Sequence, residues 1–201
     1  MKTKVKKITY SLLDELWQQY LRRVSYAKTY SKMVIERGGE VVNDHIAFRS
    51  LNTHTGEQPE GIKAFRHIIE SLEYKPVANY KFPIKKLNAI HFEHPDPMFP
   101  KIFVSQLEVS QLPSWAKEII DRTVRDTEYI ISDNAIGLLK ILKETGELPS
   151  EAADILVYEL AGYFRRPWNM PVTSCPLPLK FGQTLYAGWP RSSGVHLRRK
   201  N

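Results

Sequence analysis

The segment from residue 40 to residue 109 constrains the fold most, because its hydrophobic pattern changes type several times in a definite order. Residues 40–51 are rich in Val, Ile and Phe without a helical stripe, which is typical of a strand. Residues 60–72 place apolar side chains on one side of a helix, and residues 74–82, 87–93 and 101–109 again have strand patterns. The order strand, helix, strand, strand, strand predicts one βαβββ unit in an α+β fold.

Helical patterns flank this unit on both sides. Two precede it, at residues 10–24 and 26–37, and the Gly38-Gly39 pair ends the second; three more follow it, at residues 114–124, 134–145 and 150–164. We therefore divide the chain into four parts. They are an N-terminal helical segment (1–39), the βαβββ unit (40–112), a second helical segment (113–166) and an irregular, basic C-terminal tail (167–201).

The net charge of +7 suggests a polyanionic partner at first sight, but the basic residues gather at the two ends. Four lysines lie within residues 1–7 and four basic residues within 191–201, and neither stretch contains an acid. The body between them is close to neutral, whereas a nucleic-acid-binding domain typically carries a basic stripe on its folded face. We therefore expect no nucleic-acid partner.

The chain also lacks the sequence signals of membrane insertion or secretion. Its apolar stretches are only a few residues long, so no membrane span is expected. No apolar leader follows the basic start, which favours a cytoplasmic protein and leaves an organellar location open. The single cysteine excludes an intramolecular disulfide and a cysteine-built zinc site.

The first predicted strand carries the candidate chemistry. Alternation along a strand places His45, Ala47 and Arg49 on one face and Asp44 and Phe48 on the other. His45 and Arg49 would then be about 13 Å apart between their Cα atoms. Neutral imidazole is a common metal ligand, and arginine binds carboxylates through two parallel hydrogen bonds. On the pattern alone, a hydrogen-bonded histidine and a surface ion pair are the more common outcome.

Two further side chains are weaker candidates for the same concavity. His91 shares a strand face with Ala89 and Glu93, and Glu108 follows Gln106 on the last predicted strand. A second imidazole and a carboxylate could complete a metal site with His45. The alternatives are a satisfied interior histidine and a charge at the edge of the sheet.

Residues 42–51, with the sequence VNDHIAFRSL, resemble the signature strand of the 2-oxoadipate dioxygenase/decarboxylase family, also called 2-hydroxyglutarate synthase. Residues 100–109, 164–168 and 183–189 are similar to that family as well, so the resemblance covers most of the chain. The family is similar in fold to the vicinal-oxygen-chelate, or glyoxalase-like, proteins, in which two βαβββ units form a barrel. The resemblance therefore implies that this chain supplies one such unit, half of a two-unit barrel.

The resemblance also implies an activity. Members of the family resemble Fe(II) enzymes that use O₂ to convert a 2-oxo dicarboxylic acid, 2-oxoadipate, into 2-hydroxyglutarate and CO₂. By that resemblance His45 would be an iron ligand and Arg49 would bind a carboxylate of the substrate. A site of two histidines and one carboxylate leaves positions on the iron open for O₂ and a chelating 2-oxo acid.

The family's second unit, with its second histidine and its carboxylate ligand, has no counterpart before Asn201. We therefore expect a chain that is truncated relative to the family. Three interpretations remain: a truncated enzyme with impaired activity, a homodimer in which a second copy completes the barrel, and a non-catalytic binding or assembly module. We favour the first.

Overall fold

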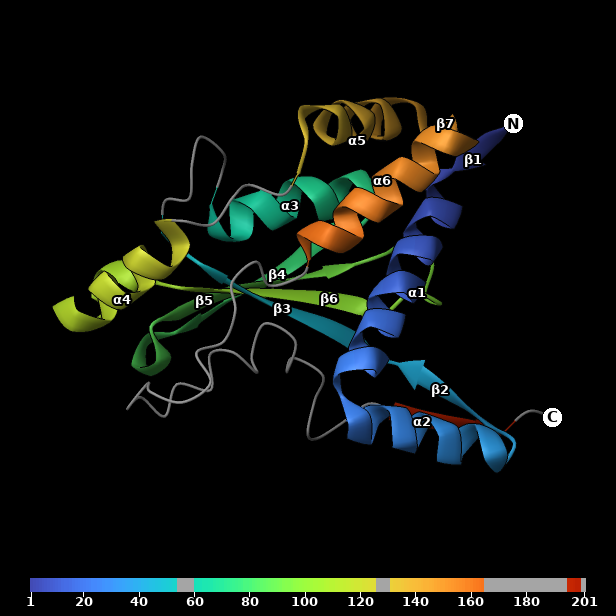
Figure 1. Cartoon of the computed structure of the whole chain (residues 1–201), viewed down its shortest axis with the longest axis horizontal. Coiled ribbons are helices and arrows are strands. Elements are labelled where there is room, and N and C mark those ends of the chain that lie inside the picture. The colour runs from blue at the N-terminus through green and yellow to red at the C-terminus, as the bar shows by residue number, and fades with distance from the viewer. Residues whose placement is uncertain (54–59, 126–130, 165–194, 200–201) are drawn as a thin grey trace.

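The computed structural model describes residues 1–53, 60–125, 131–164 and 195–199 (Figure 1). At its centre lies a four-stranded sheet of β3 (His45–Leu51), β4 (Lys75–Phe82), β5 (Leu87–Glu93) and β6 (Lys101–Leu107). The strand order is β3-β6-β5-β4, with β3 parallel to β6 and the other neighbours antiparallel. Helix α3 (Gly61–Ser71) connects β3 to β4, so the predicted βαβββ unit and the α+β class are confirmed. The sheet is open and does not close into a barrel.

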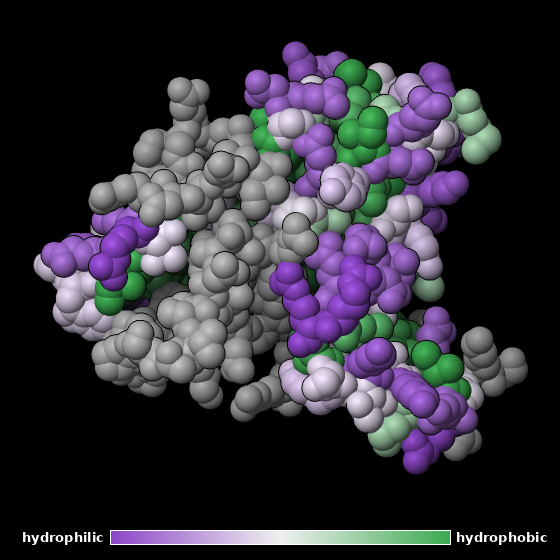
Figure 2. All heavy atoms as spheres, in the orientation of Figure 1, coloured by the Kyte–Doolittle hydropathy of each residue, from purple (hydrophilic) through white to green (hydrophobic). Residues whose placement is uncertain are grey.

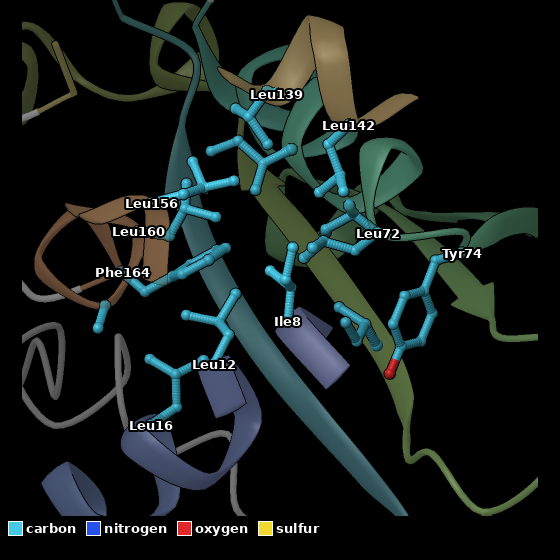
Figure 3. Close-up of a cluster of buried hydrophobic side chains, with 14 of the residues drawn as sticks. Ile8, Leu12, Leu16, Leu72, Tyr74, Leu139, Leu142, Leu156, Leu160 and Phe164 are labelled. Carbon is cyan, nitrogen blue, oxygen red and sulfur yellow. The ribbon is translucent and has the colours of Figure 1, made fainter. Parts of the chain in front are cut away.

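Helices α1 (Val5–Arg23), α3, α5 (Asp133–Thr145) and α6 (Ser150–Tyr163) bury one face of this sheet (Figure 1). Strand alternation turns Ile46, Phe48, Val104 and Phe92 toward these helices, and each of these four side chains is buried. Figure 3 shows the helical side of this core, where side chains from α1, α5 and α6 meet. Among them are Ile8, Leu12, Leu139, Leu142, Leu156 and Leu160. The core therefore occupies one face of the sheet and leaves the other face for the candidate site.

The helices confirm the predicted patterns, with shifted ends. Helix α1 begins at Val5 rather than Tyr10, and α2 (Ser25–Glu36) and α4 (Ser114–Arg125) lie close to their predicted ranges. Ser132 caps α5, and its Oγ accepts a hydrogen bond from Ala135 N at 3.1 Å. Two short 3₁₀ helices, η1 (Pro83–Lys85) and η2 (Val109–Gln111), lie between β4 and β5 and after β6.

Two short strands near the start of the chain and before α6 were not expected. Strand β1 (Lys2–Lys4) pairs antiparallel with β7 (Glu147–Pro149), which joins the first residues to the beginning of α6. Ser150 N donates a hydrogen bond to Met1 O at 3.0 Å. Three residues are too few for an alternating pattern, so only the long-range pairing defines these strands.

The strand predicted over residues 40–51 is two strands. Strand β2 (Gly39–Asn43) ends before Asp44, and β3 begins at His45. Strand β2 pairs antiparallel with β8 (Val195–Arg199), away from the central sheet. Residues 195–199 therefore form a strand within the tail expected to be irregular, and residues 167–194 lie outside the described part of the chain.

The described surface is polar in character. Hydrophilic side chains predominate on the described part of the face shown in Figure 2, with smaller hydrophobic areas between them. None of the helices in the described ranges is long and apolar enough to cross a membrane.

Candidate active site

The break between β2 and β3 determines the surroundings of His45. Alternation along one continuous strand would place Asp44 on the face opposite His45. Asp44 instead belongs to neither strand, and its Oδ2 lies 3.0 Å from His45 Nδ1. The backbone N–H of Lys101 donates to Asp44 O at 3.0 Å and holds this bend against the start of β6. The prediction for Asp44 was therefore wrong, because the bend removes it from the alternation.

His45 is oriented by two contacts on the face of the sheet opposite the helices. The Asp44 carboxylate accepts the Nδ1 proton, and the imidazole meets the Phe103 ring edge-on with their centroids 5.4 Å apart. No hydrogen bond to Nε2 is formed by the described residues. A carboxylate that accepts a hydrogen bond from one imidazole nitrogen and leaves the other nitrogen for a metal is the usual arrangement around a metal-binding histidine. His45 thus fits the role of a metal ligand, and Asp44 is a supporting residue that sequence reasoning missed.

Arg49 lies on the same face, two side-chain positions along β3. Its Nη1 donates a hydrogen bond to Ser105 Oγ at 2.6 Å. Burial of the guanidinium lowers the pKa of Arg49, and Nε is a buried donor for which the described residues provide no acceptor. Within the described ranges no carboxylate forms an ion pair with it. A partly buried cation with a free donor is suited to bind an anion.

His91 lies on the same face but forms its own set of contacts. Its Nδ1 lies 2.9 Å from the Tyr80 hydroxyl, and its Nε2 lies 3.4 Å from a Glu93 carboxylate oxygen. The ring stacks on Phe103 with centroids 5.0 Å apart, so His45 and His91 both pack against the same phenyl ring. The structure places His91 near His45 but with both nitrogens already engaged.

Glu108 lies at the far end of β6 from Lys101, the residue that pairs with His45. With a strand rise of about 3.3 Å per residue, this separates Glu108 from His45 by roughly 20 Å. Its carboxylate accepts hydrogen bonds from the side-chain amides of three residues: Asn52 at 2.9 Å, Asn88 at 2.6 Å and Gln106 at 2.8 Å. Burial alone would raise the pKa of Glu108, but the three donors outweigh it and the pKa is lowered. The structure does not bring Glu108 to His45.

The described residues do not by themselves form a metal site. Among them, no group of three or more His, Cys, Asp and Glu side chains is placed to hold a metal ion. The resembling segments at residues 165–168 and 183–189 lie outside the described part of the chain. The face of the sheet opposite the helices carries one oriented imidazole and one guanidinium that forms no ion pair with the described residues.

The described βαβββ unit and its helices have the fold of a glyoxalase-superfamily protein. A glyoxalase-superfamily structure from Ralstonia eutropha JMP134 is similar to this chain with a TM-score of 0.78 and 26% identity. The similarity covers 85% of this chain and 54% of that one. The chain belongs to the 2-oxoadipate dioxygenase/decarboxylase (HGLS) family, whose sequence profile matches residues 5–175.

Curated plant relatives agree with this assignment. The 2-oxoadipate dioxygenase/decarboxylase of rice (Oryza sativa subsp. japonica), named as chloroplastic/amyloplastic, is 30% identical over 127 residues, which cover 57% of this chain and 34% of the relative. The chloroplastic enzyme of Arabidopsis thaliana is 27% identical over 145 residues, covering 64% and 38%. The aligned part of this chain thus spans little more than a third of their length.

The solved structure of rice hydroxyglutarate synthase in complex with 2-oxoadipate has a related fold. It is similar to this chain with a TM-score of 0.55 and 21% identity, over 83% of this chain and 48% of that one. The similarity again reaches about half of the larger protein, as it does for the Ralstonia structure. It supports the shared fold of the βαβββ unit and its helices.

Proposed function

We propose that this chain contributes to an Fe(II)-dependent dioxygenase/decarboxylase reaction that converts a 2-oxo dicarboxylic acid, 2-oxoadipate, and O₂ into 2-hydroxyglutarate and CO₂. Family membership supports the reaction class. The observation that carries the proposal is the pairing of an oriented His45 with a partly buried Arg49 that has no acidic partner among the described residues. One sheet face thus offers a metal ligand and a carboxylate-binding residue.

His45 on this face fits an iron site, but the described residues do not complete the set of ligands. Asp44 holds His45 Nδ1, so Nε2 is the nitrogen that would bind the metal. One imidazole gives little affinity by itself. The further ligands would come from residues outside the described ranges or from a second copy of the chain.

The role of Arg49 follows from its charge and its donors. A 2-oxo dicarboxylic acid has a chelating 2-oxo acid end and a second carboxylate at the other end. The chemistry that bound Fe(II) supplies is O₂ activation beside the chelated end. Arg49 would bind the second carboxylate, and the separation of about 13 Å between the His45 and Arg49 Cα atoms leaves room for an extended acid between two inward-reaching side chains.

The experiment that tests this proposal measures iron binding and O₂ consumption on the full chain. Fe(II) uptake is followed anaerobically by metal analysis, and O₂ consumption is followed with 2-oxoadipate, for wild type, His45→Ala and His67→Ala. His67 is an exposed histidine on α3 and serves as the matched control. We expect His45→Ala to lose iron and O₂ consumption and His67→Ala to retain both.

Light scattering after size exclusion completes the test by giving the oligomeric state at which iron binds. Iron uptake by a dimer alone would favour the shared site. Absence of iron uptake in every oligomeric state would refute the proposal for this chain and favour the non-catalytic binding module. Equal loss of iron in His45→Ala and His67→Ala would also count against it.

A further inference from the structure

Arg49 is held by a short chain of hydrogen bonds that begins on the backbone. In the parallel register of β3 and β6, Arg49 lies opposite Ser105. Ser105 is only 5% exposed, and its hydroxyl donates to Phe48 O at 3.4 Å. The same oxygen accepts a hydrogen bond from Arg49 Nη1, with the two atoms 2.6 Å apart. A buried hydroxyl with a backbone acceptor thus holds one end of the guanidinium.

This tether leaves a definite part of the guanidinium for a ligand. One N–H of Nη1 is bound to Ser105, and among the donors that remain, Nε and Nη2 lie side by side along one edge. Nε is buried and has no acceptor in the part of the chain that the structure describes. A buried donor without a partner costs free energy, which an anion at that edge would recover. Two adjacent N–H groups match the two oxygens of a carboxylate.

We propose that Ser105 is a positioning residue for Arg49, presenting its Nε–Nη2 edge to the second carboxylate of the substrate. The inference rests on the proposed function, since it assumes that Arg49 binds that carboxylate. It adds a residue that acts only through Arg49 and touches no substrate atom. Without the tether the guanidinium keeps its charge but loses its fixed orientation, so its preference for a dicarboxylic acid falls.

Ser50 provides a matched control for Ser105. Its hydroxyl donates to Ser105 O at 3.1 Å, so it also makes one side-chain hydrogen bond between β3 and β6. Alternation places it on the face opposite Arg49. Ser50→Ala therefore removes a similar bond without affecting the guanidinium.

The first measurement needs no substrate. The side-chain nitrogen resonances of Arg49 are recorded by NMR in metal-free wild type, Ser105→Ala, Ser105→Thr and Ser50→Ala. We expect hindered rotation of the guanidinium and slow exchange of its Nη protons in wild type and Ser50→Ala. Ser105→Ala should lose both, and Ser105→Thr, which keeps the hydroxyl, should restore them.

The second measurement is the ratio of the dissociation constants of 2-oxohexanoate and 2-oxoadipate, which share a chain length and differ in the second carboxylate. It is taken by anaerobic calorimetry with Fe(II). We expect Ser105→Ala to reduce the ratio by about tenfold, because bidentate geometry is lost while the charge remains. Ser105→Thr and Ser50→Ala should stay near wild type, and the affinity for 2-oxohexanoate should not change.

The outcomes separate the two proposals. Ser105→Ala with wild-type NMR behaviour and a wild-type ratio would overturn the positioning role, and so would an equal effect of Ser50→Ala. An Arg49→Ala variant that keeps the wild-type ratio would overturn the proposed role of Arg49 instead. A wild-type chain without any preference for 2-oxoadipate would overturn both.

Discussion

Gly61 begins α3 in a position that no other residue should occupy without loss of stability. Its φ of +61° lies in the left-handed region, and an added Cβ would overlap Gln106 Oε1 and lie 2.7 Å from Gln106 Cδ. That oxygen accepts the N–H of Ile62 at 2.9 Å, and the Gln106 amide donates to Glu108 Oε1 at 2.8 Å. Substitution therefore affects the backbone, the first turn of α3 and the hydrogen bonds of Glu108 together.

The expected loss follows from two contributions. Alanine in the left-handed region costs about 1 kcal/mol. Gln106 is a flexible side chain and can swing away from the new Cβ, so the steric overlap itself is cheap. Its displacement then breaks one bond to Ile62, worth about 1 kcal/mol, and one to a carboxylate, worth about 2 kcal/mol before water replaces part of both. We expect Gly61→Ala to lower the free energy of unfolding by about 2–3 kcal/mol.

Gly38 and Gly146 provide matched controls, because they share the positive φ without the overlap. Their φ values are +74° and +72°, and no atom of the described residues lies within 4 Å of an added Cβ at either position. Gly38→Ala and Gly146→Ala should each cost about 1 kcal/mol in urea unfolding. In a Gln106→Ala background, Gly61→Ala should lower the free energy of unfolding no more than the control substitutions do. A double-mutant cycle measures this difference. Equal losses for Gly61→Ala and the two controls would refute the role of Gln106.

Three further predictions concern pH, metal affinity and the core. Burial lowers the pKa of His94 below its ordinary 6.5, so the unfolded state takes up protons that the folded state does not. Unfolding followed at several pH values should therefore show stability falling as pH falls below 6.5, with a flatter profile for His94→Gln. Asp44→Ala should weaken Fe(II) binding about tenfold in calorimetric titration, the low end for a carboxylate that orients a metal-binding histidine, because Asp44 is half exposed. Leu156→Ala should cost about 3 kcal/mol in urea unfolding, since Leu156 is fully buried, whereas its half-exposed neighbour Ile155→Ala should cost about 0.5 kcal/mol. A pH profile unchanged by His94→Gln, unchanged metal affinity in Asp44→Ala, or similar losses at Leu156 and Ile155 would contradict these expectations.

The order of elements could be predicted because each leaves a periodic pattern in its own residues. The apolar spacing of residues 60–72 is local and predicts α3, and alternation correctly separates the buried Phe48 from His45 and Arg49. These patterns arise because each element buries one face against the rest of the chain. They can be recognised without knowing which element it packs against. The fold class and the shared face of the two candidate residues were therefore accessible from the sequence.

The side chains that orient His45 and Arg49 could not be predicted from the sequence, because their placement depends on long-range strand pairing. Strand β2 leaves the central sheet to pair with β8, more than 150 residues away in the chain, and this pairing accompanies the bend at Asp44. Ser105 lies opposite Arg49 only in the observed β3–β6 register. The one local signal was a carboxylate next to a histidine, and the assumption of a continuous strand placed it on the wrong face.

His45 and Arg49 both depend on the pairing of β3 with β6 for their orientation. His45 is oriented by Asp44, whose carbonyl binds the backbone N–H of Lys101, and Arg49 is oriented by Ser105. Lys101 and Ser105 are four residues apart on β6, as His45 and Arg49 are on β3, and each pair is in register. A slip of one residue would turn the side chains of one strand to the other face, so neither support would survive it. The parallel pairing of β3 with β6 therefore fixes His45 and Arg49 together, and substitutions that weaken this pairing should impair both of their proposed roles at once.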